Sequence, residues 1–590
     1  MKNLTKPDFP GKFRISPRPP HPKGIKAKVL FSCVPGPYAV NSDDSRVETP
    51  MELCHSQITR YQGGFTIREH TMSYNLKLLA CNLDAPCYVL DFPTWTQFEN
   101  ELINVQYDII GITSIITNYE KTKKMCDIIR KYQPETQIII GGHIVNDDVD
   151  LQDIDADYMV LGEGITWLRE YLGQNPDENI KHPITIDTQN TIIGGVSIPT
   201  KFTLQSAPVF VGVGCPFGCT FCKTSAKFGG KGSYIPFLKT GDDIFNVCNN
   251  IEKETGIKRF NLFDENFLSF KARALRFLEL MKANNKDWEI NAFGSAKALE
   301  SYDPEELARM GLGLVWMGIE GSNQEYDKLK GTDTIQLVKK LQSYGISFIG
   351  SSIMCSLNHT PENIDYDIDY AIKHNVELMQ FMQYYPTPGT PLFKELHQKG
   401  MINDLQFTDY TAQKWLNFDH PNIPSGMEID IMKKAFAKDF EINGPSIIRI
   451  LRTQFEGYNR YKNSDNKAIK KRFSRTVNNQ WAIFSSAMTW SARKYFKKKG
   501  NPPLVKKMND FLNQLHNEFG KIVTISTPIM GRLFYKLLTR EEKKQAKGHQ
   551  YEPYCTFSKN DAALSLEDSE LEKTKRKKIK INDIPWIYIK

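Results

Sequence analysis

The sequence predicts an α/β protein in three parts: an N-terminal doubly wound domain, an open βα barrel of six strands, and a mainly helical C-terminal region. Two stretches of the 590-residue chain alternate apolar strands with helical patterns, and this alternation stops near residue 395. Strands that are apolar throughout and separated by helices form parallel sheets with helices on both faces. The length suits about three or four domains of ~150 residues each.

The first series of strands predicts the doubly wound domain over residues 25–175, behind an extended arm at 1–24 that is rich in proline and lysine. Sheets of this kind bind ligands beyond the carboxyl ends of their strands. A helix is expected at 119–132. The expected strands are KVLFSCV (28–34), CYVLDFP (87–93), YDIIGITSIIT (107–117), TQIIIGGH (136–143) and DYMVLGEG (157–164).

Residues 176–205 are expected to form a linker, in which the stretch NTIIGGVSIP suits a hairpin. The second series then predicts the barrel over 206–395, and active sites of βα barrels lie at the C-terminal ends of the strands. The expected barrel strands are 208–214, 259–265, 289–295, 313–320, 347–354 and 378–390. The helices expected between them are 240–254, 268–284, 303–310, 324–343 and 362–375.

Residues 396–550 predict a helical C-terminal domain, and 551–590 a charged tail that is mobile or peripheral. Within the helical part, 443–461 mixes an apolar stripe with arginines. Such a helix could lie on a membrane or cover the active-site mouth. The simpler alternative is an ordinary amphipathic helix with a solvated basic face.

Composition limits the function classes. The net charge of +8 is modest for this length and does not by itself indicate a nucleic-acid partner. No secretory signal and no apolar run of about 18 residues is found, so a cytoplasmic protein is expected, with peripheral membrane contact left open. Eleven cysteines, an odd number, in a long chain without an export signal argue for a reducing compartment rather than a disulfide framework.

Three cysteines lie within eight residues, in the stretch VGVGCPFGCTFCK. Cys215, Cys219 and Cys222 can ligate one small metal centre from a single loop. Structural zinc sites and ferredoxin clusters normally use four ligands, and no nearby Cys or His supplies a fourth, since the next cysteine is Cys248. The spacing therefore favours a [4Fe–4S] cluster with one iron left open for a substrate, and a zinc knuckle is the alternative.

This C-x3-C-x2-C loop after the first strand of a βα series resembles the motif of the radical SAM superfamily, over residues 205–395. The resemblance implies that the three cysteines hold the cluster and that S-adenosylmethionine (SAM) chelates the open iron. Reductive cleavage, with electrons from a donor such as flavodoxin or ferredoxin, then yields a 5′-deoxyadenosyl radical. In such enzymes the cofactor carries the difficult chemistry, and the protein orients and shields it.

Several residues near the predicted strand ends are candidates for binding SAM. The resemblance places an aromatic residue between the last two cysteines near the adenine, and it suggests roles for the strand-end groups. Asp264 and Glu265 could instead cap the helix that follows, and the role of Ser295 is equally open. The segment 384–393, which contains Tyr384, could be a turn that contacts no ligand. The expected SAM-binding residues are Phe221, Asp264, Glu265, Ser295, Gly318, Glu320 and Tyr384.

A doubly wound domain ahead of such a barrel resembles the cobalamin-binding domain of the cobalamin-dependent branch of this superfamily. Glycines at the strand ends would let the backbone approach a flat ligand or its nucleotide tail. The residues expected to bind cobalamin are Thr113, Ser114, Gly141, Gly142, His143, Gly162, Glu163 and Gly164.

One departure from the family pattern concerns the cobalt ligand. The D-x-H-x-x-G signature is absent, and a capping or core role is favoured for His143, so axial ligation is in doubt. Other interpretations of the domain are a degenerate fold that binds nothing, or a different nucleotide site. Cys33 is expected to be a buried thiol rather than a cobalt ligand.

The resemblance implies an enzyme that uses a [4Fe–4S] cluster, SAM and cobalamin to methylate an unactivated carbon of a small-molecule or lipid-like substrate. No residue is assigned a catalytic role beyond cofactor binding. One alternative is a cobalamin-dependent cyclase, oxidase or rearrangement enzyme that transfers no methyl group. Another is a non-catalytic cobalamin or redox sensor.

Overall fold

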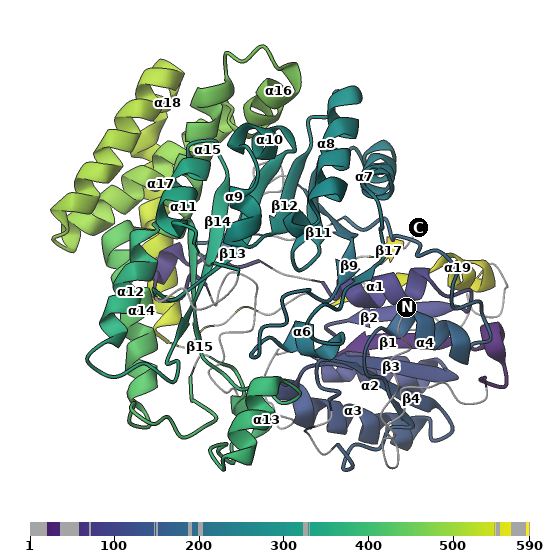
Figure 1. The fold of residues 1–590 in the computed structure, drawn as a ribbon. Helices are drawn as coiled ribbons and strands as arrows, with labels where there is room; N and C mark the ends of the chain where they lie inside the picture. The colour runs from purple at the N-terminus through teal and green to yellow at the C-terminus, as the bar shows by residue number, and fades with distance from the viewer. Residues whose placement is uncertain are drawn as a thin grey trace.

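The computed structural model describes residues 20–35, 58–69, 72–146, 148, 151–186, 191–198, 205–322, 328–329, 331–412, 414–547, 549, 551, 555–567 and 586–588. It confirms the expected α/β architecture. In Figure 1, the barrel lies between the N-terminal domain on one side and a group of long C-terminal helices on the other. Most of the expected arm at 1–24 falls outside the described residues.

The N-terminal domain is built on five parallel strands with the spatial order β2-β1-β3-β4-β5. Each begins within an expected apolar run: β1 (Val29–Cys33), β2 (Cys87–Asp91), β3 (Ile109–Ser114), β4 (Gln137–Gly142) and β5 (Tyr158–Met159). Because successive strands are added on opposite sides of β1, a crevice forms where β1 and β3 end. Such a crevice is where ligands bind in open sheets of this kind.

Helices cover both faces of this sheet, as the apolar strands require. α2 (Trp95–Asn104) and α3 (Tyr119–Tyr132) pack on one face, where Phe98, Leu102, Met125 and Ile129 are buried. α1 (Tyr74–Cys81) and α4 (Gly164–Tyr171) pack on the other. α3 matches its expected bounds because its apolar residues recur at helical spacing between two strands.

The expected charged tail differs from the structure. β16 (Thr556–Lys559) pairs antiparallel with β2, and β17 (Trp586–Tyr588) pairs with β16, which extends the N-terminal sheet to seven strands. The unpaired edge of β2 is a ready template for another strand. Asn560 holds the segment that follows β16 against the N-terminal domain. Its Nδ2 donates to the carbonyls of Ala80, Leu83 and Ala85 at 2.9–3.1 Å.

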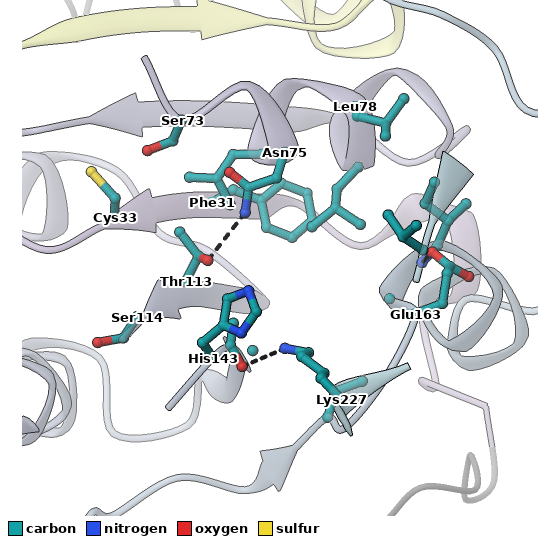
Figure 2. Close-up of a pocket in the computed structure, with 18 of the residues that line it drawn as sticks. Phe31, Cys33, Ser73, Asn75, Leu78, Thr113, Ser114, His143, Glu163 and Lys227 are labelled. Atoms are coloured by element: carbon teal, nitrogen blue, oxygen red, sulfur yellow. Dashed lines mark hydrogen bonds between the residues drawn. The ribbon is translucent and has the colours of Figure 1, made fainter. Parts of the chain in front are cut away.

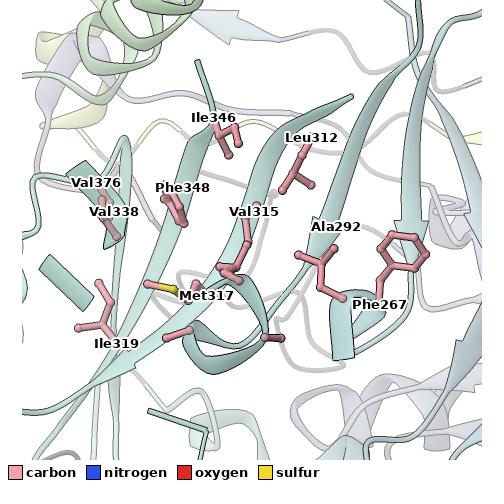
Figure 3. Close-up of a cluster of buried hydrophobic side chains, with 14 of the residues drawn as sticks. Phe267, Ala292, Leu312, Val315, Met317, Ile319, Val338, Ile346, Phe348 and Val376 are labelled. Carbon is pink, nitrogen blue, oxygen red and sulfur yellow. The ribbon is translucent and has the colours of Figure 1, made fainter. Parts of the chain in front are cut away.

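Six parallel strands form the barrel in sequential order, and its two free edges make it open. They are β8 (Ala207–Phe210), β11 (Arg259–Phe263), β12 (Glu289–Phe293), β13 (Leu312–Glu320), β14 (Ser347–Met354) and β15 (Leu378–Gln383). The connecting helices are α7 (Gly241–Thr255), α8 (Lys271–Ala283), α9 (Ala296–Glu300), α10 (Pro304–Arg309), α11 (Thr334–Gln342) and α12 (Ile364–Lys373). Figure 3 shows side chains such as Val315, Met317 and Phe348 in the apolar core between strands and helices.

The first expected barrel strand ends earlier than predicted. β8 stops at Phe210, and β9 (Gly212–Val213) turns away to pair antiparallel with β10 (Ile235–Pro236). A Cβ on Gly212 would lie 2.8 Å from the Ile235 carbonyl oxygen, so only glycine allows this close pairing. The cysteine loop therefore leaves from a short hairpin beside the barrel mouth.

The C-terminal region is helical, as expected. It contains α13 (Pro391–Gln398), α14 (Met427–Asn443), α15 (Ser446–Tyr461), α16 (Lys467–Thr476), α17 (Asn479–Lys498) and α18 (Pro502–Gln545). α18 is broken at Gly520, whose φ of 71° and ψ of −154° are not helical, so that it consists of two segments. No helix in the described ranges has the length and apolar character needed to cross a membrane.

The interpretation of 443–461 as a membrane-lying helix or a cover for the active-site mouth is wrong. The apolar stripe of α15 is buried, with Ile448, Leu451 and Phe455 almost fully enclosed. Thr453 bonds to Glu377, which directly precedes β15, and Gly457 touches Gly345, which precedes β14. α15 therefore closes the amino ends of the strands, opposite the expected active site.

The expected hairpin in the linker is confirmed: β6 (Ile192–Ile193) pairs antiparallel with β7 (Val196–Ser197). The segment 58–69, expected in the N-terminal domain, instead packs with this hairpin on α18. Gly64 lies against the backbone of Leu538, and Arg68 forms a buried ion pair with Glu541 at 3.3 Å. This contact links residues 473 apart in the chain, which local sequence patterns do not report.

Candidate active site

A cavity of about 610 Å³ opens where the carboxyl ends of β1, β3 and β4 face the barrel. Its wall comes from the N-terminal domain, from α6 (Lys223–Lys227) behind the cysteine loop, and from the end of β11. All eight residues expected to bind cobalamin line it, although binding itself stays a prediction. Figure 2 shows Thr113, His143 and Lys227 around this space.

Two adjacent glycines shape the cavity floor in different ways. Gly142 has a φ of +89°, and a Cβ there would collide with the Ser114 carbonyl and lie 2.8 Å from the Ser114 nitrogen. A Cβ on Gly141, by contrast, would meet nothing within 4 Å, and the same holds at Gly162. Gly142 is therefore required by the fold, whereas Gly141 and Gly162 leave room for a ligand to approach the backbone.

Two residues that line the same cavity carry buried polar atoms without hydrogen-bond partners in the described part of the chain. The Nδ1 atom of His143 and the Oδ1 atom of Asn118 are buried and have no hydrogen-bond partner among the described residues. Burial, and then Lys227 and Lys223, lower the pKa of His143 to about 3, so its ring is neutral. A buried polar atom normally has a partner. These residues suit a ligand that, like cobalamin, carries amide groups around a flat ring. A capping or core role was expected for His143, and among the described residues its Nδ1 has no hydrogen-bond partner, so a core role stays a prediction.

The other expected cobalamin residues already have partners within the chain. Ser114 shares a 2.7 Å hydrogen bond with Thr122, and Thr113 accepts one from Asn75 at 3.1 Å. Glu163 caps α4, where its carboxylate accepts from the backbone of Ile165 and Thr166. Their main contribution is to hold the cavity wall in place, while the hydroxyl proton of Thr113 can still be donated to a ligand.

Cys33, expected to be a buried thiol, is one. Its Sγ donates to Asp91 at 3.1 Å and accepts from the Phe92 amide. Burial and the Asp91 carboxylate raise the pKa of the thiol well above its usual value, so it stays protonated. A protonated thiol bound to a carboxylate is a poor cobalt ligand.

The three loop cysteines are half-buried, form no disulfide, and lie between β9 and α6. The loop is held by hydrogen bonds from Cys222 N to Cys219 O at 3.0 Å and from Gly232 N to Pro216 O at 2.9 Å. Gly218 needs its φ of +65°, and a Cβ there would lie 2.5 Å from the Lys231 Cα. Within the described ranges, no three His, Cys, Asp or Glu side chains converge as ligands of a single metal ion.

The donor chemistry of this loop fits an iron–sulfur cluster. Burial, and then the neighbouring cysteines and Glu265, raise the pKa of Cys215 to about 11. Burial also raises the pKa of Cys222. Since ligation requires thiolates, metal loading must release these protons. Three thiols on one loop would hold three irons of a cubane cluster and leave the fourth for another ligand.

The cysteine loop is joined to both other sides of the cavity. The Lys227 Nζ donates to the Gly142 carbonyl oxygen at 2.5 Å, and Lys223 donates to the Pro388 carbonyl in the turn after β15. That turn reaches the N-terminal domain, where Gly389 N donates to Asp148 at 2.6 Å. α6 therefore connects the N-terminal sheet, the cysteine loop and the last barrel strand.

The expected SAM residues at the end of β11 have different environments. Asp264 is buried in an ion pair with Arg273 and accepts from Tyr234 at 2.7 Å. Its carboxylate is therefore occupied within the protein. Glu265 lines the cavity. Burial by the surrounding groups, and then the negative charge of Asp264, raise the pKa of Glu265 to about 7. Of the two, Glu265 is the carboxylate that a ligand can reach.

The remaining expected SAM residues lie along β12, β13 and β15. Ser295 caps α9, where its hydroxyl accepts from Ala298 N at 3.3 Å. A Cβ on Gly318 would collide with the Glu320 carboxylate, so the space above Gly318 is used by the chain itself and not left for a ligand. Glu320, at a φ of +59°, forms a buried ion pair with Lys328.

Phe221 and Tyr384 meet edge-to-face at the barrel mouth, with ring centroids 6.3 Å apart. Lys328 lies 5.7 Å from the Phe221 ring. Burial opposes the charge on Lys328, but Glu320 and the cysteines outweigh it and raise its pKa. The structure thus gathers Phe221, Tyr384 and Glu320 around one lysine beside the cysteine loop.

Sequence reasoning missed Lys227, Lys328 and Asn118. Lys227 could have been found from the sequence, because it lies five residues after Cys222, in the helix that directly follows the cysteine loop. Lys328 and Asn118 had none, since each is defined by a partner or a cavity assembled from distant segments.

Comparisons with known proteins agree with this division of the chain. Residues 74–172 match the B12 binding domain, and residues 209–397 match the Radical SAM superfamily. Bacteriochlorophyllide d C-12(1)-methyltransferase of Chlorobaculum tepidum is 25% identical over 332 residues, which cover 52% of this chain and 70% of that protein. Hopanoid C-2 methylase of Rhodopseudomonas palustris is 24% identical over 201 residues, covering 32% and 37%.

A solved structure of the radical SAM methyltransferase TsrM from Kitasatospora setae, with cobalamin and a [4Fe–4S] cluster bound, is also similar. It shares 14% sequence identity at a TM-score of 0.48, over 76% of this chain and 98% of that one.

The two domain matches define a radical SAM enzyme that also carries a cobalamin-binding domain. The chain thus combines a cobalamin-binding domain with a radical SAM domain, for which cobalamin, SAM and a [4Fe–4S] cluster are the cofactors.

Proposed function

We propose that this enzyme transfers a methyl group to an unactivated carbon of an apolar small-molecule or lipid-like substrate. The observation that carries the proposal is one cavity that the cobalamin-binding domain shares with the ends of the barrel strands and with α6, the helix that directly follows the cysteine loop. Gly141 and His143 line it from one side, and Lys227 and Glu265 from the other. A substrate between them would face both cofactors.

When bound, SAM at the cluster would supply the radical that removes a hydrogen atom, and cobalamin would supply the methyl group. The residues of the chain hold and shield this arrangement. We assign Cys215, Cys219 and Cys222 to the cluster, and the glycine edges of β4 and β5 to the corrin ring. Glu265 could accept a hydrogen bond from a ligand in the cavity, and the Lys227–Gly142 bond holds the two domains in register.

The cavity wall supports an apolar substrate. Phe31, Phe210, Phe263 and Phe293 line it, and the rings of Phe210 and Phe263 stack 5.5 Å apart. Aromatic walls exclude water and offer an apolar surface to a bound substrate. Two proteins that the chain resembles are named as methylating a bacteriochlorophyllide and a hopanoid, and we take molecules of these kinds as the first substrates to test.

The test is anaerobic reconstitution of the full chain with iron, sulfide and cobalamin, then reaction with methyl-deuterated SAM and a reductant. Dithionite would replace the physiological donor, for which a flavodoxin or ferredoxin is expected. A panel of hopanoids and chlorophyll precursors serves as substrate. We expect 5′-deoxyadenosine and a product heavier by one deuterated methyl group.

The variant Cys222→Ala should abolish 5′-deoxyadenosine formation. Cys81→Ala, which replaces a partly buried cysteine outside the cavity lining, should leave it unchanged. Deoxyadenosine with an altered but unmethylated product would favour a cyclase, oxidase or rearrangement enzyme. No deoxyadenosine from the unmutated protein would favour a sensor.

A further inference from the structure

Four large apolar side chains are exposed along one stripe of the second segment of α18. Ile522, Ile525, Ile529 and Leu533 are 72%, 66%, 63% and 50% exposed. Their spacing of three, four and four residues places them on one face of the helix. The other exposed large apolar side chains of the described residues are far apart in the sequence, and single exposed apolar residues are normal on a protein surface.

The fold does not need this stripe, because the opposite face of the same helix makes the internal contacts. Val523, Thr527 and Gly531 are buried there. Gly531 lies against the Trp490 ring of α17, and its carbonyl accepts from Ser491 Oγ at 2.9 Å. Figure 1 shows α17 and α18 side by side at the end of the molecule farthest from the N-terminal domain.

The positive charge of the protein is concentrated around this stripe. Residues 479–547 contain 14 Lys and Arg but only 4 Asp and Glu, a net charge of +10. Since the whole chain carries +8, the other residues carry a net −2. The fold thus collects an excess of basic residues on the helical pair that also exposes the isoleucines.

Basic residues continue the stripe along the helix. Lys536 and Arg540 are exposed and follow Leu533 at helical spacing, and Lys547 is exposed two residues beyond the end of α18. Beside them, Lys494 of α17 lies 4.4 Å from the Tyr535 ring centroid. An apolar end followed by a basic stretch with aromatic rings nearby is the arrangement of helices that lie in the interface of a bilayer.

We propose that the face formed by Ile522, Ile525, Ile529, Leu533 and the basic residues after them binds the surface of an anionic lipid bilayer. The isoleucines would enter the acyl region and the lysines and arginines would contact acidic headgroups. A second copy is disfavoured as the occupant, because it would bring together two strongly positive faces. A nucleic acid would use the charges but not the isoleucines.

The proposal concerns a surface away from the cavity, and it holds whether or not the methyl-transfer proposal does. It is tested with the full chain by co-sedimentation with vesicles of pure phosphatidylcholine and vesicles that also contain phosphatidylglycerol. We expect binding to the anionic vesicles, weakened by salt. Replacing Lys536 or Arg540 with Gln should weaken it by about fivefold each.

The double variant Ile525→Asp with Ile529→Asp should weaken vesicle binding at least tenfold. The matched control is the double variant Ile103→Asp with Ile25→Asp, which also introduces two aspartates, at side chains 57% and 48% exposed outside α18. The control should bind as the unmutated protein does. Unchanged circular dichroism and unchanged iron loading would show that the variants are folded.

Three results would overturn the proposal. One is failure of the unmutated protein to bind anionic vesicles, and another is equal loss of binding in the Ile103 and Ile25 control variant. The third is a dimer in size-exclusion chromatography that Ile525→Asp dissociates, which would assign the stripe to a second copy. The unmutated protein could also bind a DNA duplex but not the vesicles, with no effect of the isoleucine changes. That outcome would overturn the proposal in the same way as the first result.

Discussion

Gly141 and Gly142 are neighbours at the end of β4, yet the structure predicts opposite effects of substitution. Gly141→Leu places its side chain in open cavity space, since nothing lies within 4 Å of the position of its Cβ. Replacing a strand glycine removes chain entropy from the unfolded state, worth about 0.5–1 kcal/mol. The variant without cofactors should be at least as stable as the unmutated protein.

Gly142→Ala places a methyl group against the Ser114 backbone at a φ of +89°. The left-handed conformation costs about 1–2 kcal/mol for a residue with a Cβ. Displacing the neighbouring strand adds about 1–3 kcal/mol. The sum is about 2–5 kcal/mol, so hydrogen exchange of the β3 and β4 amides should accelerate by at least about 25-fold.

Gly141→Leu should weaken cobalamin binding even though it does not reduce the stability of the protein. A leucine at 141 would overlap the bound ring, and overpacking of about 1–3 kcal/mol corresponds to a roughly 5- to 150-fold weaker Kd. Absorption titration with cobalamin measures this, and exchange mass spectrometry measures stability. Unmutated affinity in Gly141→Leu would refute the placement of cobalamin, and unchanged exchange in Gly142→Ala would refute the steric argument.

Three further predictions concern buried polar groups. Arg273→Met leaves Asp264 buried without its cation and should destabilise the barrel by about 3–5 kcal/mol in urea unfolding; Arg276→Met, on the same helix but in an exposed ion pair, should change little. Burial and a neighbouring lysine lower the pKa of Lys227 to about 7 from 10.5, so the folded state favours the neutral amine and stability should rise with pH between these values. Lys227→Met should flatten this slope by at most about 1.4 kcal/mol per pH unit, and an unchanged slope would contradict the burial of that amine. Asn560→Ala leaves backbone groups unpaired at the edge of β2, which should cost about 1–3 kcal/mol and speed exchange in β16; equal exchange would show that the edge is held by other contacts.

Patterns that are local in sequence were predicted well. The apolar runs located all five parallel strands of the N-terminal domain, because strands that are buried on both faces are apolar throughout. The six barrel strands were located as well, although β11 and β12 alternate apolar with polar residues. The cysteine spacing located the metal-binding loop. The strand-end glycines were also informative, since every residue predicted for cobalamin lines the same cavity.

Features that depend on distant partners were predicted poorly. The carboxylate of Asp264 looked available to SAM, but Arg273 from the next helix occupies it. The amphipathic pattern of α15 indicated that one face is buried but not against what, and it packs on the barrel. The exposed stripe of α18 could not be distinguished from a core-facing stripe, because periodicity does not specify which side has a partner.

The sequence by itself determined the two βα series, their order and the loop of three cysteines. Strand and helix periodicity and the spacing of metal ligands depend only on residues that are close in the sequence. The tertiary structure decided that both series open onto one cavity. That arrangement depends on α6 and its Lys227, which binds the carbonyl of a residue 85 positions earlier. It also decided that the end of the chain completes the first sheet. Such docking follows from complementary surfaces assembled across the whole chain, which no local pattern encodes.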